Sequence, residues 1–163
     1  MTLKWIALAV LITSWPVLPA RADDTLIGKA TYWYGPIRLY DAELRTPSGQ
    51  FDWRAPFELE LTYNRDFKAS DLARVSIKEM KRMGFSIQEA QLKAKLESCF
   101  ADVSGGDTIT GQSVDEDTAK FFLNGAERCT ITAPRFREAF FGIWLGEKAR
   151  YRAAARRLLG ERG

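Results

Sequence analysis

The chain has 163 residues, 46% of them hydrophobic and 28% charged, a balance typical of one globular domain with a sizeable core. It contains no histidine, which excludes serine and cysteine triads built on an imidazole base and argues against a catalytic zinc site. The formal net charge is only +3, and the Walker A, GxGxxG and CxxC motifs do not occur, so we expect neither a cofactor nor nucleic acid as a partner.

Residues 1–22 have the composition of a secretory signal peptide. Lys4 precedes an apolar stretch from Trp5 to Leu18, and small residues stand at both cleavage-specifying positions of Ala20-Arg21-Ala22. Polar residues and a proline interrupt this stretch, which falls short of the about 20 residues of a membrane-spanning helix, so an uncleaved anchor is the weaker alternative. We expect cleavage after Ala22, one domain over residues 23–163, and a periplasmic or secreted protein.

The first part of this domain is predicted to form three strands. Thr25 to Tyr34 and Ile37 to Arg45 flank Gly35-Pro36 and suit a hairpin, and the second strand ends in the turn residues 46–49. From Phe57 to Tyr63 apolar and polar residues alternate strictly, which predicts a strand with one buried and one solvent-facing side.

Two helices are predicted next. Ser70 can cap a helix that runs to Met83, where a glycine follows. Ser86 and Glu89 have the spacing of a capping box, and an apolar stripe continues from there to Phe100.

Strands then resume near Thr108 to Gln112. Lys120 to Leu123 and Ala126 to Ile131 flank Asn124-Gly125, the strongest short hairpin signal in the chain. We therefore expect a second hairpin at this point.

Two further helices are predicted at the end of the chain. Pro134 to Gly146 carries apolar side chains at 136, 139, 140, 143 and 144, the stripe of a one-sided helix that must cover an apolar surface. Phe141 lies off this stripe and needs a second apolar neighbour. Tyr151 to Leu159 repeats the spacing, and residues 147–163 hold six basic against two acidic residues. This basic segment either contacts anionic lipid weakly or forms the solvated face of a packed helix.

The order of these elements is strands, two helices, strands, two helices. It predicts an α+β domain, a mostly antiparallel sheet with a layer of helices packed on one face.

The chain has two cysteines. Cys99 lies at the end of a predicted helix, and Cys129 lies within a predicted strand. Export would place them where disulfides persist, yet both positions also suit a buried thiol. The sequence leaves open whether they are bonded.

Several blocks of this sequence, in this order, resemble the exported bacterial proteins of the chalcone isomerase-like family. The blocks are LYDAEL at 39–44, FELELTYNRDF at 57–67, DTITG at 107–111, FFLNG at 121–125 and FREAFFGIWLG at 136–146. The resemblance implies the chalcone isomerase fold, with an apolar cleft between an antiparallel sheet and its helices. Plant members of the family either close a chalcone into a flavanone or bind fatty acids, and a shared fold transfers neither activity by itself.

The catalytic residues of the enzymes have no counterpart in this sequence. Cyclisation needs a cation for the substrate phenolate and hydrogen bonds to the enone carbonyl in a dry pocket. The resemblance implies an arginine on an early strand, a few residues before Tyr40. When the residues are counted back from Tyr40 without gaps, Tyr32 occupies this position instead. Bringing Lys29 or Arg38 to that place would need a register shift or a bulge. The tyrosine and asparagine of the enzymes' first helix are also missing from 72–83, so we expect no catalytic and no metal-binding residue.

The ligand-binding candidates lie on the strands that are predicted to form the floor of the cleft. A tyrosine offers an apolar ring with one donor and acceptor at its tip, although strands favour tyrosine in any case. Arg38 could anchor an anionic headgroup, or it could pair with Asp41 or Glu43 on the solvent side. The candidates are Tyr32, Tyr34, Arg38, Tyr40 and Tyr63.

We expect a non-catalytic exported domain that binds a small apolar ligand, such as a fatty acid, between sheet and helices. The first alternative is a chalcone isomerase-type intramolecular lyase acting on an enone. The second is an envelope scaffold protein whose basic C-terminal helix docks on a membrane or a partner.

Overall fold

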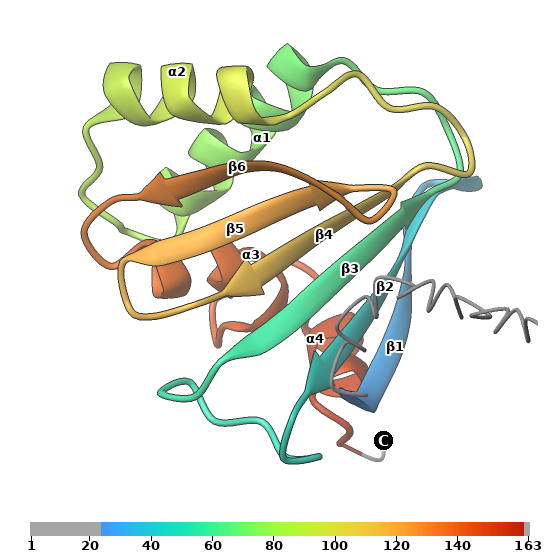
Figure 1. Cartoon of the computed structure of the whole chain (residues 1–163). Coiled ribbons are helices and arrows are strands. Elements are labelled where there is room, and N and C mark those ends of the chain that lie inside the picture. The colour runs from blue at the N-terminus through green and yellow to red at the C-terminus, as the bar shows by residue number, and fades with distance from the viewer. Residues whose placement is uncertain (1–23, 162–163) are drawn as a thin grey trace, which may run out of the picture.

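A computed structural model describes residues 24–161, so the expected signal peptide at 1–22 lies outside the described residues. It shows a six-stranded antiparallel sheet in sequential strand order, β1 to β6, with helices on one face, and the expected α+β architecture is confirmed (Figure 1). The strands are β1 Thr25–Tyr34, β2 Ile37–Thr46, β3 Phe57–Tyr63, β4 Thr108–Ser113, β5 Thr118–Leu123 and β6 Ala126–Thr132. The helices are α1 Ala69–Arg82, α2 Glu89–Cys99, η1 Arg137–Phe141, α3 Gly142–Leu145 and α4 Arg152–Leu158. None of the helices within 24–161 has the length and apolar character needed to cross a bilayer.

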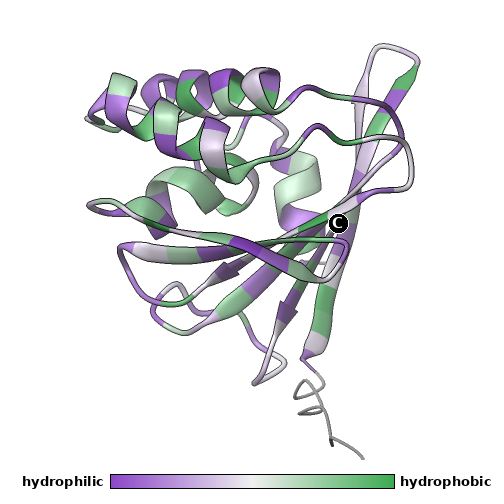
Figure 2. Cartoon of the chain, turned by 45° about the horizontal axis from the view of Figure 1, so that its top comes forward, coloured by the Kyte–Doolittle hydropathy of each residue, from purple (hydrophilic) through white to green (hydrophobic). Residues whose placement is uncertain are grey.

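The two faces of the sheet differ in polarity, as the strict alternation in β3 predicts. Phe57, Leu59, Leu61 and Tyr63 are all buried beneath the helices. The opposite face carries cross-strand polar pairs, such as Glu60 with Thr110 Oγ1. Hydrophobic and hydrophilic segments alternate along the strands in Figure 2.

The Asn124-Gly125 hairpin is also confirmed. Both residues have positive φ, 50° and 82°, as a two-residue turn of this kind requires, and β5 and β6 pair on either side of it. In the first hairpin the pairing of β1 with β2 slips near its tip, between the pairs Tyr32 with Tyr40 and Trp33 with Arg38.

The predicted caps of both central helices are wrong. Helix α1 begins at Ala69, and its N–H donates to Asp102 Oδ1 at 2.9 Å, so a carboxylate from the segment after α2 serves as the cap in place of Ser70. Helix α2 begins at Glu89 with no side-chain cap, because the Glu89 carboxylate pairs with Lys81 of α1 instead of closing a box with Ser86.

The aromatic segment near the C-terminus is not the single α-helix that its stripe predicts. A π-helical turn, η1, comes first, and the short helix α3 follows. The wider π turn brings Phe141 inward, so this ring is fully buried although it lies off the stripe, whereas Ile143 is only half-buried. Phe141 packs edge-on against Phe57, with the ring centroids 5.0 Å apart.

The C-terminal helix α4 packs on β1 and β2 through its apolar side (Figure 1). Ala155 and Leu158 are buried there, while the arginines of this helix stay exposed. The contact is so close that a Cβ on Gly28 of β1 would lie 2.0 Å from the carbonyl oxygen of Arg157. Two more basic residues of the segment, Lys148 and Arg150, bond to α1 and its C-terminal cap residue.

Cys99 and Cys129 form a disulfide that joins the end of α2 to the edge strand β6, with Cα atoms 5.4 Å apart. The bond therefore fastens the outer helix to the sheet edge, in addition to the hydrogen bond from Lys95 Nζ to the carbonyl of Thr132.

We predict that reduction of this disulfide destabilises the protein by roughly 3 to 4 kcal/mol, because the unfolded chain regains the entropy of a long loop. Urea unfolding with and without reductant measures the change. The double variant Cys99→Ser, Cys129→Ser should be insensitive to reductant; equal stability of the oxidised and reduced wild-type protein would contradict the prediction.

Candidate functional site

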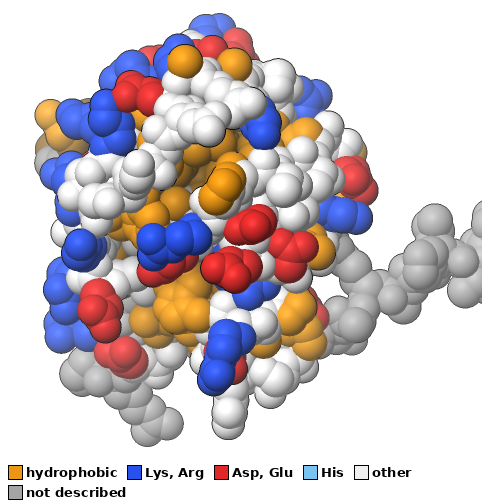
Figure 3. Space-filling view, turned by 90° about the vertical axis from the view of Figure 1, so that its left-hand side faces the viewer, with side chains coloured by type: hydrophobic (Ala, Val, Ile, Leu, Met, Phe, Trp, Pro, Cys, Tyr) orange, Lys and Arg blue, Asp and Glu red, His pale blue; other side chains and the backbone are white. Residues whose placement is uncertain are grey.

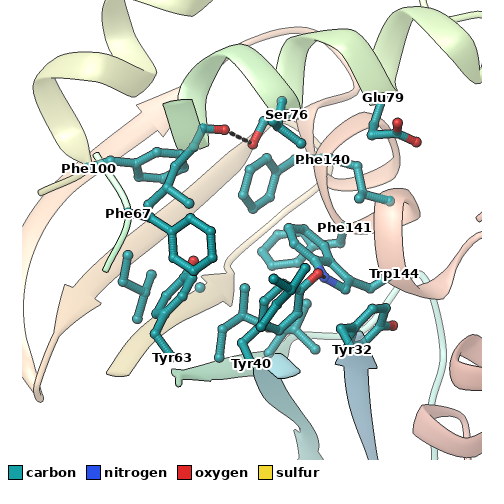
Figure 4. Close-up of a pocket in the computed structure, with 18 of the residues that line it drawn as sticks. Tyr32, Tyr40, Tyr63, Phe67, Ser76, Glu79, Phe100, Phe140, Phe141 and Trp144 are labelled. Carbon is teal, nitrogen blue, oxygen red and sulfur yellow. Dashed lines mark hydrogen bonds between the residues drawn. The ribbon is translucent and has the colours of Figure 1, made fainter. Parts of the chain in front are cut away.

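A cavity of about 270 Å³ lies between the concave face of the sheet, α1 and the aromatic segment (Figure 4). This volume is near the lower end of the roughly 300 to 1,000 Å³ usual for small-ligand sites. Its walls are mostly apolar. The wall residues from the sheet and its flanking loops are Tyr32, Leu39, Tyr40, Leu59, Leu61, Tyr63, Phe67, Phe100, Ile109, Gly111 and Phe121. The wall and rim residues from the helices and the loop before α4 are Asp71, Leu72, Val75, Ser76, Glu79, Phe140, Phe141, Ile143, Trp144, Arg150 and Tyr151.

The structure brings three of the five predicted ligand-binding residues into this cavity: Tyr32, Tyr40 and Tyr63. All three come from neighbouring strands and face the helices, because Tyr32 pairs with Tyr40 and Tyr40 pairs with Tyr63 across the sheet.

Tyr34 and Arg38 lie outside the cavity. Tyr34 stands at the tip of the first hairpin, beyond the helical layer, and 72% of its surface is exposed. The register shift next to Tyr32 does not turn Arg38 inward. Its guanidinium forms an ion pair with Asp41 on the solvent-facing side of the sheet.

The tyrosines of the cavity form a fixed row. The rings of Tyr32 and Tyr40 stack with centroids 4.8 Å apart, and Trp144 Nε1 donates to Tyr40 Oη at 3.0 Å. Burial raises the pKa of Tyr32, Tyr40 and Tyr63 well above the ordinary tyrosine value. All three side chains are therefore neutral phenols at physiological pH and can donate a proton to an acceptor.

Tyr32 differs from its neighbour in one respect. Its hydroxyl is buried and has no hydrogen-bond partner among the described residues, whereas Tyr40 Oη has the indole of Trp144. A buried polar atom without a partner costs free energy, so this hydroxyl of the cavity wall is available to form a hydrogen bond with a ligand.

Polar groups of α1 and the loop before α4 form a rim that the sequence analysis did not identify. Glu79 accepts hydrogen bonds from Arg150, through Nε at 3.1 Å and Nη2 at 2.5 Å, and from Arg82 Nε at 2.7 Å. Burial alone would raise the pKa of Glu79, but the bonds from the two arginines outweigh it and hold the pKa below its usual value. Nearby, Ser76 Oγ donates to the carbonyl of Leu72, the bond drawn in Figure 4.

One sequence signal could have indicated this rim. Ser76 and Glu79 lie on the apolar side of the predicted first helix, interleaved with buried residues such as Ile77 and Met80. A carboxylate at such a place needs a partner. The partner Arg150 is 71 residues away, in a segment without regular periodicity, and no local pattern identifies it.

A second and more open groove, of about 990 Å³, lies between the β4–β5 loop, the aromatic segment and the loop after α1. Figure 3 shows this side of the molecule, with apolar side chains in hollows between basic and acidic ones. Arg137 is buried at its base and donates to Ser113 Oγ and to the carbonyl of Trp53, both at 2.6 Å. These bonds tie the aromatic segment to β4 and to the loop after β2, which is a structural role.

The comparison with known proteins agrees with this architecture. Residues 52–160 match the family described as chalcone isomerase-like, and the chain belongs to that family. An uncharacterized protein of Haemophilus influenzae is 26% identical over 137 residues, which cover 83% of this chain and 67% of that protein. The crystal structure of a fatty-acid binding protein from Arabidopsis thaliana superposes with a TM-score of 0.67 at 10% identity, covering 90% of this chain and 91% of that one. At this identity the superposition shows a shared fold.

The cavity offers apolar contact and hydrogen bonding. Within residues 24–161 no group of three or more acidic or cysteine side chains gathers as metal ligands would. Its inner wall offers neutral phenols and aromatic rings, and its charged groups are confined to the rim.

We predict opposite effects on stability for two tyrosine variants that each remove one hydroxyl. Tyr32→Phe should leave the free energy of unfolding of the ligand-free protein unchanged or slightly raised, because no hydrogen bond is lost. Tyr40→Phe should lower it by about 1 to 3 kcal/mol, because the buried Trp144 N–H loses its acceptor. Urea unfolding of the two variants measures both changes. A larger loss of unfolding free energy in Tyr32→Phe than in Tyr40→Phe would contradict the prediction.

We also predict a pH-dependent contribution from Glu79. Because its pKa is lower in the folded than in the unfolded protein, its contribution is complete above the unfolded value of about 4.3 and declines as the pH falls through the folded value. Glu79→Gln should therefore be less stable than wild type at neutral pH, and the gap should narrow toward about pH 3. Glu138, which forms an exposed ion pair with Arg135, serves as the control, since Glu138→Gln should change the free energy of unfolding little at either pH.

Proposed function

We propose that this chain is an exported, non-catalytic binding protein that takes a small apolar ligand, such as a fatty acid, into the cavity between sheet and helices. The observation that carries the proposal is the cavity itself, which remains unfilled beneath the aromatic segment although its walls are almost entirely apolar and aromatic. The fold shared with a fatty-acid binding protein supports the same function.

The residues of the cavity favour binding over chemistry. Where the resemblance to the enzymes implies an arginine, this chain has Tyr32, a neutral phenol whose hydroxyl has no hydrogen-bond partner among the described residues. The cation of the cavity, Arg150, lies at the rim and already bonds Glu79 through two nitrogens. Cyclisation of a chalcone needs a cation placed at the reacting phenolate within the dry pocket, which this arrangement does not provide.

Export is proposed from the leader-like residues 1–22, and the disulfide between Cys99 and Cys129 supports it, because such bonds persist in oxidising compartments. We place the protein in the periplasm or outside the cell. Fractionation of cells expressing the full sequence, with N-terminal sequencing of the product, tests this assignment.

The first test of ligand binding is direct. Protein purified from cells expressing the full sequence is extracted with organic solvent, and the extract is examined by mass spectrometry for bound fatty acids. The same protein is titrated with the fluorescent fatty acid cis-parinaric acid and incubated with 2′-hydroxychalcone. A lipid-free extract together with no fluorescence response would refute the proposal, and chalcone cyclisation above the buffer rate would favour the isomerase.

We predict that Val75→Trp weakens binding of cis-parinaric acid by about tenfold or more. Val75 lies on the rim of the cavity with 48% of its surface exposed, so a larger side chain can obstruct the entrance without overpacking the core. Val114→Trp is the matched control, since Val114 is 39% exposed but lines the second groove. Equal affinities of the two variants would place the ligand elsewhere.

A further inference from the structure

The unpartnered hydroxyl of Tyr32 limits what the ligand can be. It is buried in the cavity wall, and its ring is held by the stack with Tyr40 on one side and by the edge of Tyr151, 5.6 Å away, on the other. The hydroxyl therefore cannot readily turn out to solvent. A neutral phenol in this place has a proton to donate, and no described residue accepts it, so a ligand in the cavity can supply the acceptor.

The rim next to Tyr151 carries an excess of positive charge. Glu79 is shared by two guanidinium groups, those of Arg82 and Arg150. Two arginines thus face one carboxylate here. Of the two, only Arg150 lines the cavity, and 48% of its side chain is exposed, so it can bind a second anion without losing Glu79.

The two groups lie toward one end of the cavity. Arg150 directly precedes Tyr151, whose ring touches that of Tyr32. Figure 4 shows Tyr32 and the Arg150 partner Glu79 on one side of the site, and Phe67, Tyr63 and Phe100 on the other. Tyr32 and the partner of Arg150 therefore lie toward one end of the cavity, and the rings of Phe67 and Phe100 lie toward the other (Figure 4).

We infer that Tyr32 and Arg150 together form a headgroup subsite, and that the ligand is an amphiphile with a carboxylate at this end and its apolar chain toward Phe67 and Phe100. This inference rests on the proposed function and specifies it. The cation comes from the loop before α4, and the strand contributes only a neutral donor.

The test compares decanoate with its methyl ester, which has the same chain but no charge, by titration calorimetry below the micellar range. The wild-type protein should bind decanoate more tightly than methyl decanoate. Arg150→Gln should weaken decanoate binding about tenfold and leave the ester nearly unchanged, whereas Tyr32→Phe should weaken both, because each offers an acceptor oxygen. Unfolding curves of the variants establish that each is folded.

Arg82→Gln is the matched control. It removes the other guanidinium from the same Glu79 carboxylate, yet Arg82 does not line the cavity, so Arg82→Gln should weaken decanoate binding much less than Arg150→Gln does. Equal binding of decanoate by wild type and Arg150→Gln, or equal loss in Arg82→Gln and Arg150→Gln, would overturn the subsite while leaving ligand binding intact. Failure of wild type to bind either compound would overturn the proposed function and the subsite together.

Discussion

The contact between Phe141 and Gly111 sets the distance between the aromatic segment and the sheet. A Cβ at Gly111 would lie 3.0 Å from the Phe141 ring, so any larger residue here would push the ring away from β4 by a few tenths of an ångström. Phe57 closes the other side of the ring. The segment is anchored at this point, and the cavity lies beside the anchor, between α1 and the sheet, with residues of β1 to β5 in its lining.

The π turn of η1 makes that anchor compatible with the rest of the site. In a regular α-helix, Phe141 would point away from the stripe of Phe136, Phe140 and Trp144, and one of the two sets would be left unburied. With the wider turn both are buried, and Trp144 reaches Tyr40 Oη at 3.0 Å. The tyrosine row is thereby held in place by the same segment that roofs the cavity.

The sequence predicted those parts of the structure that depend on local periodicity. Strand β3 matches from Phe57 to Tyr63 because its alternation records which side is buried. The start of α1 and the rim were not predictable in this way, because Asp102 caps Ala69 from 33 residues away and Arg150 meets Glu79 across 71. Tyr34 lies outside the cavity for a related reason: the pairing of β1 with β2 shifts register between Tyr32 and Trp33, which the strand pattern does not record.

The location of the cation separates this site from an enzyme of the same fold. A catalytic cation must bind the transition state more tightly than the substrate, which requires a fixed charge in a water-free pocket. Arg150 is half-exposed and shared with Glu79, so its field is screened and part of its donor capacity is already used. Such a group can orient a charged headgroup at equilibrium, and its place at the rim supports the proposed binding function over cyclisation.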